Sequence, residues 1–160
     1  VQEYSDYLNL CRQLKYDLKN GFILFPKDLR KAHDQAAQQC RRKESDRMHR
    51  AFCAAMKRIK SNLDFELDGM VIRCPESPKE LIREGQMLHH CVGSYVDRVA
   101  QKQCIIVFLR RKEAADQPFY TLEVRNGKVV QARTTGNSPA TPEVQKFIDL
   151  WERRVLQATA

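Results

Sequence analysis

Two histidines and a cysteine are adjacent at His89, His90 and Cys91, within the stretch LHHCVGSY of residues 88–95. A cysteine thiolate is a strong nucleophile and a nearby imidazole can take its proton, so these residue types suit covalent catalysis. On a helix, Cys91 would lie on the apolar face, with His90 rotated from it by about 100°. The stretch therefore has two interpretations: a nucleophile with its base, or a small core residue beside a boundary histidine.

A metal site is the other chemistry that these side chains could support, with Cys104 as a further ligand. Adjacent histidines on a helix do not converge on one ion, and the sequence has no second pair of ligands at metal-binding spacing. The sequence motifs of phosphate-binding loops and of zinc proteases are also absent. We therefore expect neither a metal nor another cofactor.

A second group of polar residues falls in a predicted β-hairpin. Residues 120–133 contain two apolar runs around an Asn-Gly pair, which is the strongest short hairpin signal. A two-residue turn places Gln131 opposite Leu122. The same register places Arg133 opposite Tyr120. Because an unpaired polar group beside apolar side chains is costly, this pattern indicates either the rim of a sheet or a binding site.

The elements that must position these residues follow from helix, strand and turn signals. Residues 77–80, Ser-Pro-Lys-Glu, form a capping-box start for a helix expected to end at Gly85. A second helix is expected over residues 86–100. The apolar run of residues 104–109 predicts a central strand buried on both faces, and Thr-Pro at residues 141–142 opens a last amphipathic helix.

The N-terminal third of the chain is helical by the same criteria. Apolar residues recur at helical spacing from Tyr4 to Leu18, and the Asn-Gly pair of residues 20–21 is a stop signal. A longer helical pattern runs from Pro26 to about Lys60. It is either one helix or two with a bend in the charged middle.

These elements predict an α+β fold class: an N-terminal basic helical part, a helix pair, a small mainly antiparallel sheet with a hairpin, and a C-terminal helix. The expected domains are a basic helical region over residues 1–62 and an α+β core over residues 63–160. The core carries the LHHCVGSY motif.

The net charge of +8 is concentrated in the N-terminal part. Residues 1–60 contain 14 Lys and Arg against 7 Asp and Glu, whereas residues 61–160 contain 14 against 13. On a helix, Met48, Phe52 and Met56 share an apolar stripe and the basic residues lie opposite, as in proteins that bind a phosphate backbone. A solvated face without a partner is the alternative. The residues expected to contact nucleic acid are Arg41, Arg42, Lys43, Arg47, Arg50, Lys57 and Arg58.

The cysteines and the apolar runs bear on the compartment. The six cysteines are 13 to 29 residues apart without a CxxC pair, which favours free thiols in a reducing compartment. The longest apolar run, residues 104–109, is too short to cross a membrane. We therefore expect a cytoplasmic protein without a membrane partner. The first residue is Val, which indicates a fragment.

Several of these stretches resemble the signature of PcfJ-like proteins, which occur in conjugative plasmids, phages and related mobile elements. The core of the resemblance is LHHCVGSY with Glu84-Gly85 before it, followed by Thr121-Leu122-Glu123, Gln131-Ala132-Arg133 and Asn137. Residues 4–8 and 25–34 resemble the segment that precedes this core. Family members are usually longer, so the resemblance implies a C-terminal fragment. It implies a DNA-mobility setting more firmly than a reaction.

The resemblance implies an accessory protein of mobile genetic elements, and the basic helix predicts that it associates with DNA or RNA; other DNA-transfer proteins are further possible partners. The alternative is a Cys/His-dependent hydrolase or transferase acting on nucleotide or phosphodiester substrates. An assembly role without either activity is a third interpretation. In the enzyme, the expected catalytic residues are His90, Cys91, Tyr95, Glu123 and Gln131. The expected substrate-binding residues, several of them implied by the resemblance, are His89, Arg110, Thr121, Arg133 and Asn137.

Overall fold

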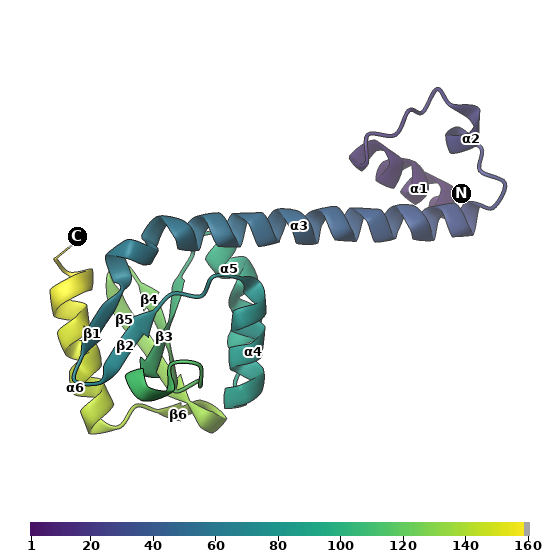
Figure 1. The fold of residues 1–160 in the computed structure, drawn as a ribbon. Coiled ribbons are helices and arrows are strands. Elements are labelled where there is room, and N and C mark those ends of the chain that lie inside the picture. The colour runs from purple at the N-terminus through teal and green to yellow at the C-terminus, as the bar shows by residue number, and fades with distance from the viewer. Residues whose placement is uncertain (159–160) are drawn as a thin grey trace. The chain divides into compact units, whose positions relative to one another are not determined.

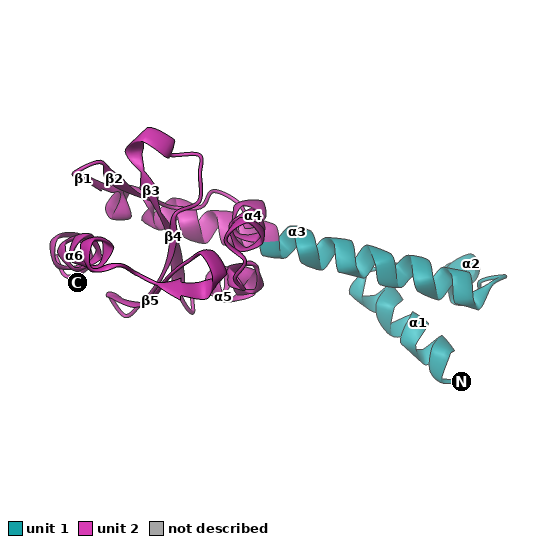
Figure 2. Cartoon of the chain, turned by 90° about the horizontal axis from the view of Figure 1, so that it is seen from below, with its two compact units in different colours: residues 1–48 teal, residues 49–160 magenta. Residues whose placement is uncertain are grey.

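The structure is a computed structural model that describes residues 1–158. The chain forms two compact units, Val1–Met48 and His49–Ala160, coloured separately in Figure 2. The boundary between them falls inside helix α3 (Leu29–Leu63), whereas the sequence prediction placed it between residues 62 and 63. Each unit has its own core.

The first unit consists of α1 (Gln2–Gln13), α2 (Gly21–Leu24) and the first part of α3. Its buried core residues are Tyr7, Cys11, Leu14 and Ala36. The hydroxyl of Tyr7 donates to the carbonyl of Ile23 at 2.8 Å, which ties α2 to α1.

The predicted stop of the first helix at residues 20–21 is wrong. Helix α1 ends earlier, at Gln13, and Lys15 follows in the left-handed region with φ 59°. Asn20 instead begins α2, because its side chain accepts a hydrogen bond from the backbone N–H of Phe22. Asparagine is favoured at such a cap as well as at a stop, so its presence alone did not distinguish the two.

The long helical pattern forms one helix, α3, of 35 residues. Phe52 and Met56 are buried in the second unit, as expected for the apolar stripe of an amphipathic helix. No helix within residues 1–158 has the length and apolar character needed to cross a membrane.

The second unit is built on a six-stranded antiparallel sheet whose strands follow chain order. The strands are β1 (Phe65–Leu67), β2 (Met70–Arg73), β3 (Ile105–Arg111), β4 (Tyr120–Arg125), β5 (Lys128–Thr134) and β6 (Ser138–Pro139). Residues 106–110 of β3 are all buried, which confirms the predicted central strand. Asn126 and Gly127 both have positive φ, as a tight hairpin turn requires.

Helices cover both faces of this sheet. Helix α6 (Pro142–Trp151) lies on one side, and α4 (Pro78–Leu88) and α5 (Val96–Ala100) lie on the other (Figure 1). Trp151 is fully buried and its indole N–H donates to the carbonyl of Leu63 at 3.0 Å. A sheet with helices outside it and a separate helical part confirm the predicted α+β class.

The predicted helix pair differs from the observed structure between residues 85 and 95. Helix α4 continues through Gly85 and ends at Leu88, because His89 turns into the left-handed region with φ 53°. The chain then folds back against Gly85, and a 3₁₀ turn, η1 (Val92–Tyr95), precedes α5. A Cβ on Gly85 would lie 2.9 Å from the carbonyl oxygen of His90, so only glycine permits this approach. Cys91 is therefore not on a helix face, and it is exposed.

The predicted hairpin register is correct near the turn and wrong beyond it. Val124 pairs with Val129 as expected, but a β-bulge follows, so that Gln131 pairs with Glu123 and Arg133 pairs with Thr121. The additional residue on β5 is Val130, which is 54% exposed. Because a bulge adds one residue to one strand, both polar side chains change faces. Gln131 and Arg133 now share the face of Glu123 and Thr121.

Candidate functional site

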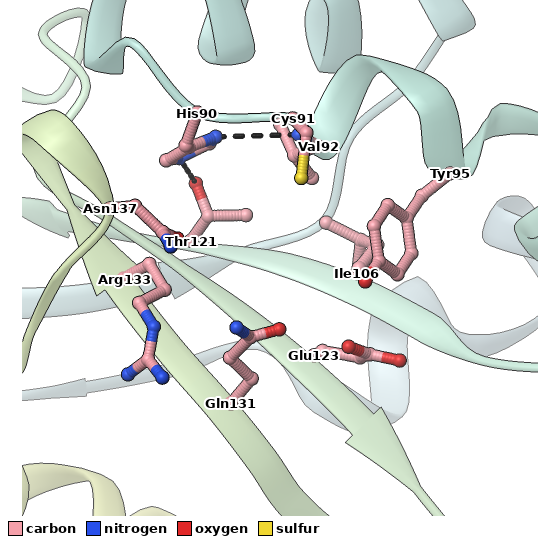
Figure 3. Close-up of a pocket in the computed structure, with 10 residues that line it drawn as sticks. All are labelled: His90, Cys91, Val92, Tyr95, Ile106, Thr121, Glu123, Gln131, Arg133 and Asn137. Atoms are coloured by element: carbon pink, nitrogen blue, oxygen red, sulfur yellow. Dashed lines mark hydrogen bonds between the residues drawn. The ribbon is translucent and has the colours of Figure 1, made fainter.

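A pocket opens on the face of the sheet that also carries helix α4 (Figure 3). Strands β3, β4 and β5, the segment after α4 and the turn after β5 contribute its walls. The residues that line it are His90, Cys91, Val92, Tyr95, Ile106, Thr121, Glu123, Gln131, Arg133 and Asn137. The fold thus brings together all five predicted catalytic residues and three of the five predicted substrate-binding residues. Val92 and Ile106 are additions that the sequence analysis missed.

The imidazole of His90 is held by a chain of hydrogen bonds that starts in the core. The hydroxyl of Thr121 donates to Glu84 Oε1 at 3.1 Å. Its single proton is thereby used, so Thr121 Oγ1 accepts from His90 Nε2, also at 3.1 Å. His90 Nδ1 accepts from the backbone N–H of Val92 at 3.4 Å. These bonds assign the proton of the neutral ring to Nε2.

Burial is the main effect on the pKa of His90, and it lowers that pKa from its usual value. A smaller opposing effect comes from the negative charge of Glu84. The side chain is therefore a neutral base at neutral pH, with its basic nitrogen at Nδ1. A neutral imidazole whose second nitrogen is anchored is the arrangement that general-base catalysis requires.

Glu84 and Arg110 form a buried ion pair behind this chain. Their side chains are 2% and 4% exposed, and two guanidinium nitrogens contact the two carboxylate oxygens at 2.9 and 2.6 Å. The guanidinium also lies 4.5 Å from the centre of the Phe108 ring. Arg110, predicted to bind substrate, does not line the pocket. It holds Glu84 in place.

Glu84 belongs to the site, although the sequence analysis gave it no role beyond the family signature. A signal for it exists in the sequence: Leu81, Gly85 and Leu88 form the buried face of α4, and Glu84 lies on that same face. A carboxylate on an apolar stripe needs a charged partner. The sequence did not identify which arginine supplies it.

The thiol of Cys91 points into the pocket (Figure 3). Of the six cysteines, all within the described residues, Cys91 is the exposed one. By contrast, burial raises the pKa of Cys74 to about 12. Within residues 1–158, Cys91 Sγ makes no hydrogen bond to His90.

The charged residues of the pocket differ in whether they have partners. Glu123 is 6% exposed and forms an ion pair with Arg125 at 2.6 Å. Arg133 is half-buried, and its Nη1 donates to the carbonyl of Ala132 at 3.1 Å. No carboxylate within residues 1–158 forms an ion pair with Arg133. Arg133 is therefore a lining residue whose charge no carboxylate of the described residues neutralises.

The other predicted residues lie outside the pocket. His89 is exposed at the end of α4. The seven basic residues predicted to contact nucleic acid are all exposed on α3, and Arg47 also forms an ion pair with Glu44 at 2.8 Å. Within residues 1–158, no group of three or more His, Cys, Asp or Glu side chains is arranged to hold a metal ion.

Comparison with known proteins places this architecture in a family. The family model described as "PcfJ-like protein" matches residues 3–148. The chain is also 31% identical over 158 residues to "Uncharacterized protein Lin1253/Lin1744" of Listeria innocua serovar 6a (strain ATCC BAA-680 / CLIP 11262). That match covers 98% of this chain and 35% of the Listeria protein, so the chain spans about a third of its relative's length. No solved structure matches. The family match, which extends over both units, shows that the chain belongs to the PcfJ-like proteins.

Proposed function

We propose that residues 49–158 carry the catalytic pocket of a hydrolase or transferase, with Cys91 as nucleophile and His90 as its general base. The observation that carries this proposal is a chain of hydrogen bonds from a histidine in the pocket to a buried carboxylate. His90 is held by Thr121, and Thr121 is held by Glu84. An exposed thiol follows directly in the sequence.

The proposed reaction proceeds through a covalent intermediate. The hydrogen bond from Val92 to His90 Nδ1 is long at 3.4 Å, so this nitrogen can accept the thiol proton of Cys91. The thiolate then attacks the electrophilic carbon or phosphorus of the substrate, and the leaving group departs with the proton from His90. Water or a second substrate displaces Cys91 in the next step, which regenerates the thiol. Glu84 stabilises the imidazolium through Thr121.

The reactivity of Cys91 tests this proposal without knowledge of the substrate. We expect iodoacetamide to modify Cys91 at neutral pH, and His90→Gln to slow the modification about tenfold, because the base is lost. Peptide mass spectrometry reports the rate at each cysteine separately. His89→Gln is the matched control, because it changes the adjacent exposed histidine. A Cys91 rate that is the same in both variants contradicts the proposal.

Association with nucleic acid is a second proposed function, and the exposed basic side chains of α3 support it. Such side chains bind phosphates through charge and the release of counterions. The setting proposed for this activity is the transfer or maintenance of mobile DNA in the bacterial cytoplasm, with DNA, RNA or other transfer proteins as partners. The match of residues 3–148 to the PcfJ-like family model supports this proposal.

Charge reversal tests the nucleic-acid function on the full chain. We expect fluorescence anisotropy to detect salt-dependent binding of a single-stranded oligonucleotide. Lys57→Glu with Arg58→Glu should reduce the slope of log K against log salt by about 1 to 2. The control is Lys146→Glu with Arg154→Glu, which changes the net charge equally at exposed positions outside α3. Equal losses in the two double variants contradict a role for α3.

A further inference from the structure

We infer that the pocket binds a nucleotide, with its phosphate at Arg133 and its base at Tyr95. This inference rests on the proposed function, because it names the ligand class of the same pocket. Three features carry it: a guanidinium without a carboxylate partner, an aromatic ring, and two amide side chains without hydrogen-bond partners, as judged among residues 1–158. Figure 3 shows Arg133 and Tyr95 on opposite sides of the pocket, with Gln131 between them.

The charge in the pocket favours an anionic ligand. Glu123 is neutralised by Arg125, and Glu84, behind the pocket, is neutralised by Arg110. Arg133 uses Nη1 for the carbonyl of Ala132 and makes no other hydrogen bond or ion pair within residues 1–158. The remaining N–H donors of its guanidinium are free to bind a phosphate. Two such donors can bond two phosphate oxygens at once.

The opposite side of the pocket suits a flat, partly apolar group. The ring of Tyr95 has the guanidinium of Arg98 at 4.8 Å from its centre, and Val92 and Ile106 are the apolar neighbours that line the pocket with it. Bases stack on aromatic rings, and a guanidinium beside the ring strengthens such a platform.

The side-chain amides of Gln131 and Asn137 also line the pocket, where they can form hydrogen bonds to a base or a sugar. Neither Gln131 nor Asn137 makes a side-chain hydrogen bond within residues 1–158, although both line the pocket. An amide offers a donor and an acceptor together, which is what the edge of a nucleobase presents. A nucleotide combines the ring, the hydrogen-bonding edge and the anion.

The nucleotide can be free or can be the phosphorylated end of a strand, and the experiment separates these sources. Calorimetric titration uses the full chain carrying Cys91→Ser, so that no covalent intermediate forms. The ligands are the common nucleoside monophosphates, the parent nucleosides, and short oligonucleotides with and without a terminal phosphate. We expect at least one phosphorylated ligand to bind about tenfold more tightly than its unphosphorylated counterpart.

Variants then assign the two ends of the ligand. Arg133→Gln should abolish the preference for phosphate and leave nucleoside binding intact, whereas Tyr95→Leu should weaken both ligands. Lys128→Gln, which removes one positive charge from the same strand outside the pocket, should have no effect. Thermal unfolding of each variant checks that the variant is folded. If a variant does not fold, the difference in affinity between nucleotide and nucleoside on the Cys91→Ser chain still tests the inference.

The outcomes separate this inference from the catalytic proposal. Absence of binding by every nucleotide and oligonucleotide, or an unchanged preference in Arg133→Gln, overturns the inference. Binding by monophosphates identifies a free nucleotide, and binding by phosphorylated oligonucleotides alone identifies a strand end; both support it. Nucleotide binding together with an unreactive Cys91 contradicts only the catalytic proposal.

Discussion

Glu84 anchors His90 through Thr121 but does not itself line the pocket. Its carboxylate is shared between Arg110 and Thr121, so one buried charge is compensated by the arginine and also orients His90 through the hydroxyl. A buried ion pair is maintained only when both partners are present. Arg110, which was expected to contact substrate, lies behind the pocket and pairs with Glu84.

Removal of Arg110 should therefore be far more damaging than a surface substitution. We expect Arg110→Met to lower the free energy of unfolding by about 3–5 kcal/mol, because it leaves Glu84 buried without a partner. The double variant Glu84→Gln with Arg110→Met should recover much of this loss. Urea unfolding measures both. A loss below about 1 kcal/mol in Arg110→Met would show that the carboxylate is solvated and the pair dispensable.

The lowered pKa of His90 predicts how stability depends on pH. Burial disfavours the charged ring in the folded state, so the unfolded chain binds a proton first as pH falls below the usual value of 6.5. The contribution of neutral His90 to the free energy of unfolding is complete above that pH, and it is lost as the pH falls through the lowered pKa of the folded state. We expect His90→Gln to show a smaller loss of stability over this window in urea unfolding. Equal pH dependence in both proteins would contradict the assignment of a buried neutral imidazole.

At the scale of elements, the pocket depends on two local irregularities. The bulge at Val130 turns Gln131 and Arg133 toward the pocket, and the end of α4 at His89 places Cys91 in the pocket lining instead of on a buried helix face. Regular continuation of either element would disperse these side chains. The end of α4 depends on Gly85, because the backbone of the segment after α4, at His90 and Gly93, packs directly against this glycine.

Gly85→Ala tests this packing. Alanine is the better helix former by about 1 kcal/mol, yet we expect the substitution to destabilise the protein by about 1–3 kcal/mol. Its Cβ would lie 2.9 Å from the oxygen of His90 and 3.2 Å from the nitrogen of Gly93, both backbone atoms. Gln86→Ala, at the adjacent exposed position, should change stability by less than about 0.5 kcal/mol. Stabilisation by Gly85→Ala in urea unfolding would refute the close approach.

At the scale of the whole molecule, the two units differ in the size of their cores. The buried cluster of residues 1–48 contains four residues, whereas the second unit has a sheet covered on both faces. Small units bury too little apolar surface to be very stable. Trp151, the single tryptophan, is buried in the second unit and so reports on that unit.

We therefore expect urea to unfold the chain in two steps. The loss of helical circular dichroism should begin at a lower urea concentration than the change in Trp151 fluorescence, because residues 1–48 unfold first. Leu14→Ala, in the core of the first unit, should move the first step and leave the fluorescence transition unchanged. Coincident curves from the two probes would indicate a single cooperative unit.

Local physical chemistry was sufficient to predict much of this protein from its sequence. The Asn-Gly turn, the apolar run of β3 and the Thr-Pro start of α6 each depend on neighbouring residues, and all three are present in the structure. The α+β class follows from the same local signals, whereas the family was indicated by the resemblance of the LHHCVGSY stretch to PcfJ-like proteins. The motif around His90 also marked the pocket, since reactive residue types that are close in sequence cannot lie far apart in space.

Tertiary contacts decided what the pocket contains. Thr121 lies 37 residues after Glu84, and Arg110 lies 26 residues after it, so no local pattern could join the three. The bulge was hidden because Val129 and Val130 are both apolar, and alternation cannot show which of them is the additional residue. The exposure of Cys91 likewise depends on the approach of one backbone segment to Gly85. Sequence periodicity records which residues prefer burial, whereas the partner of each polar group is decided only when distant segments pack together.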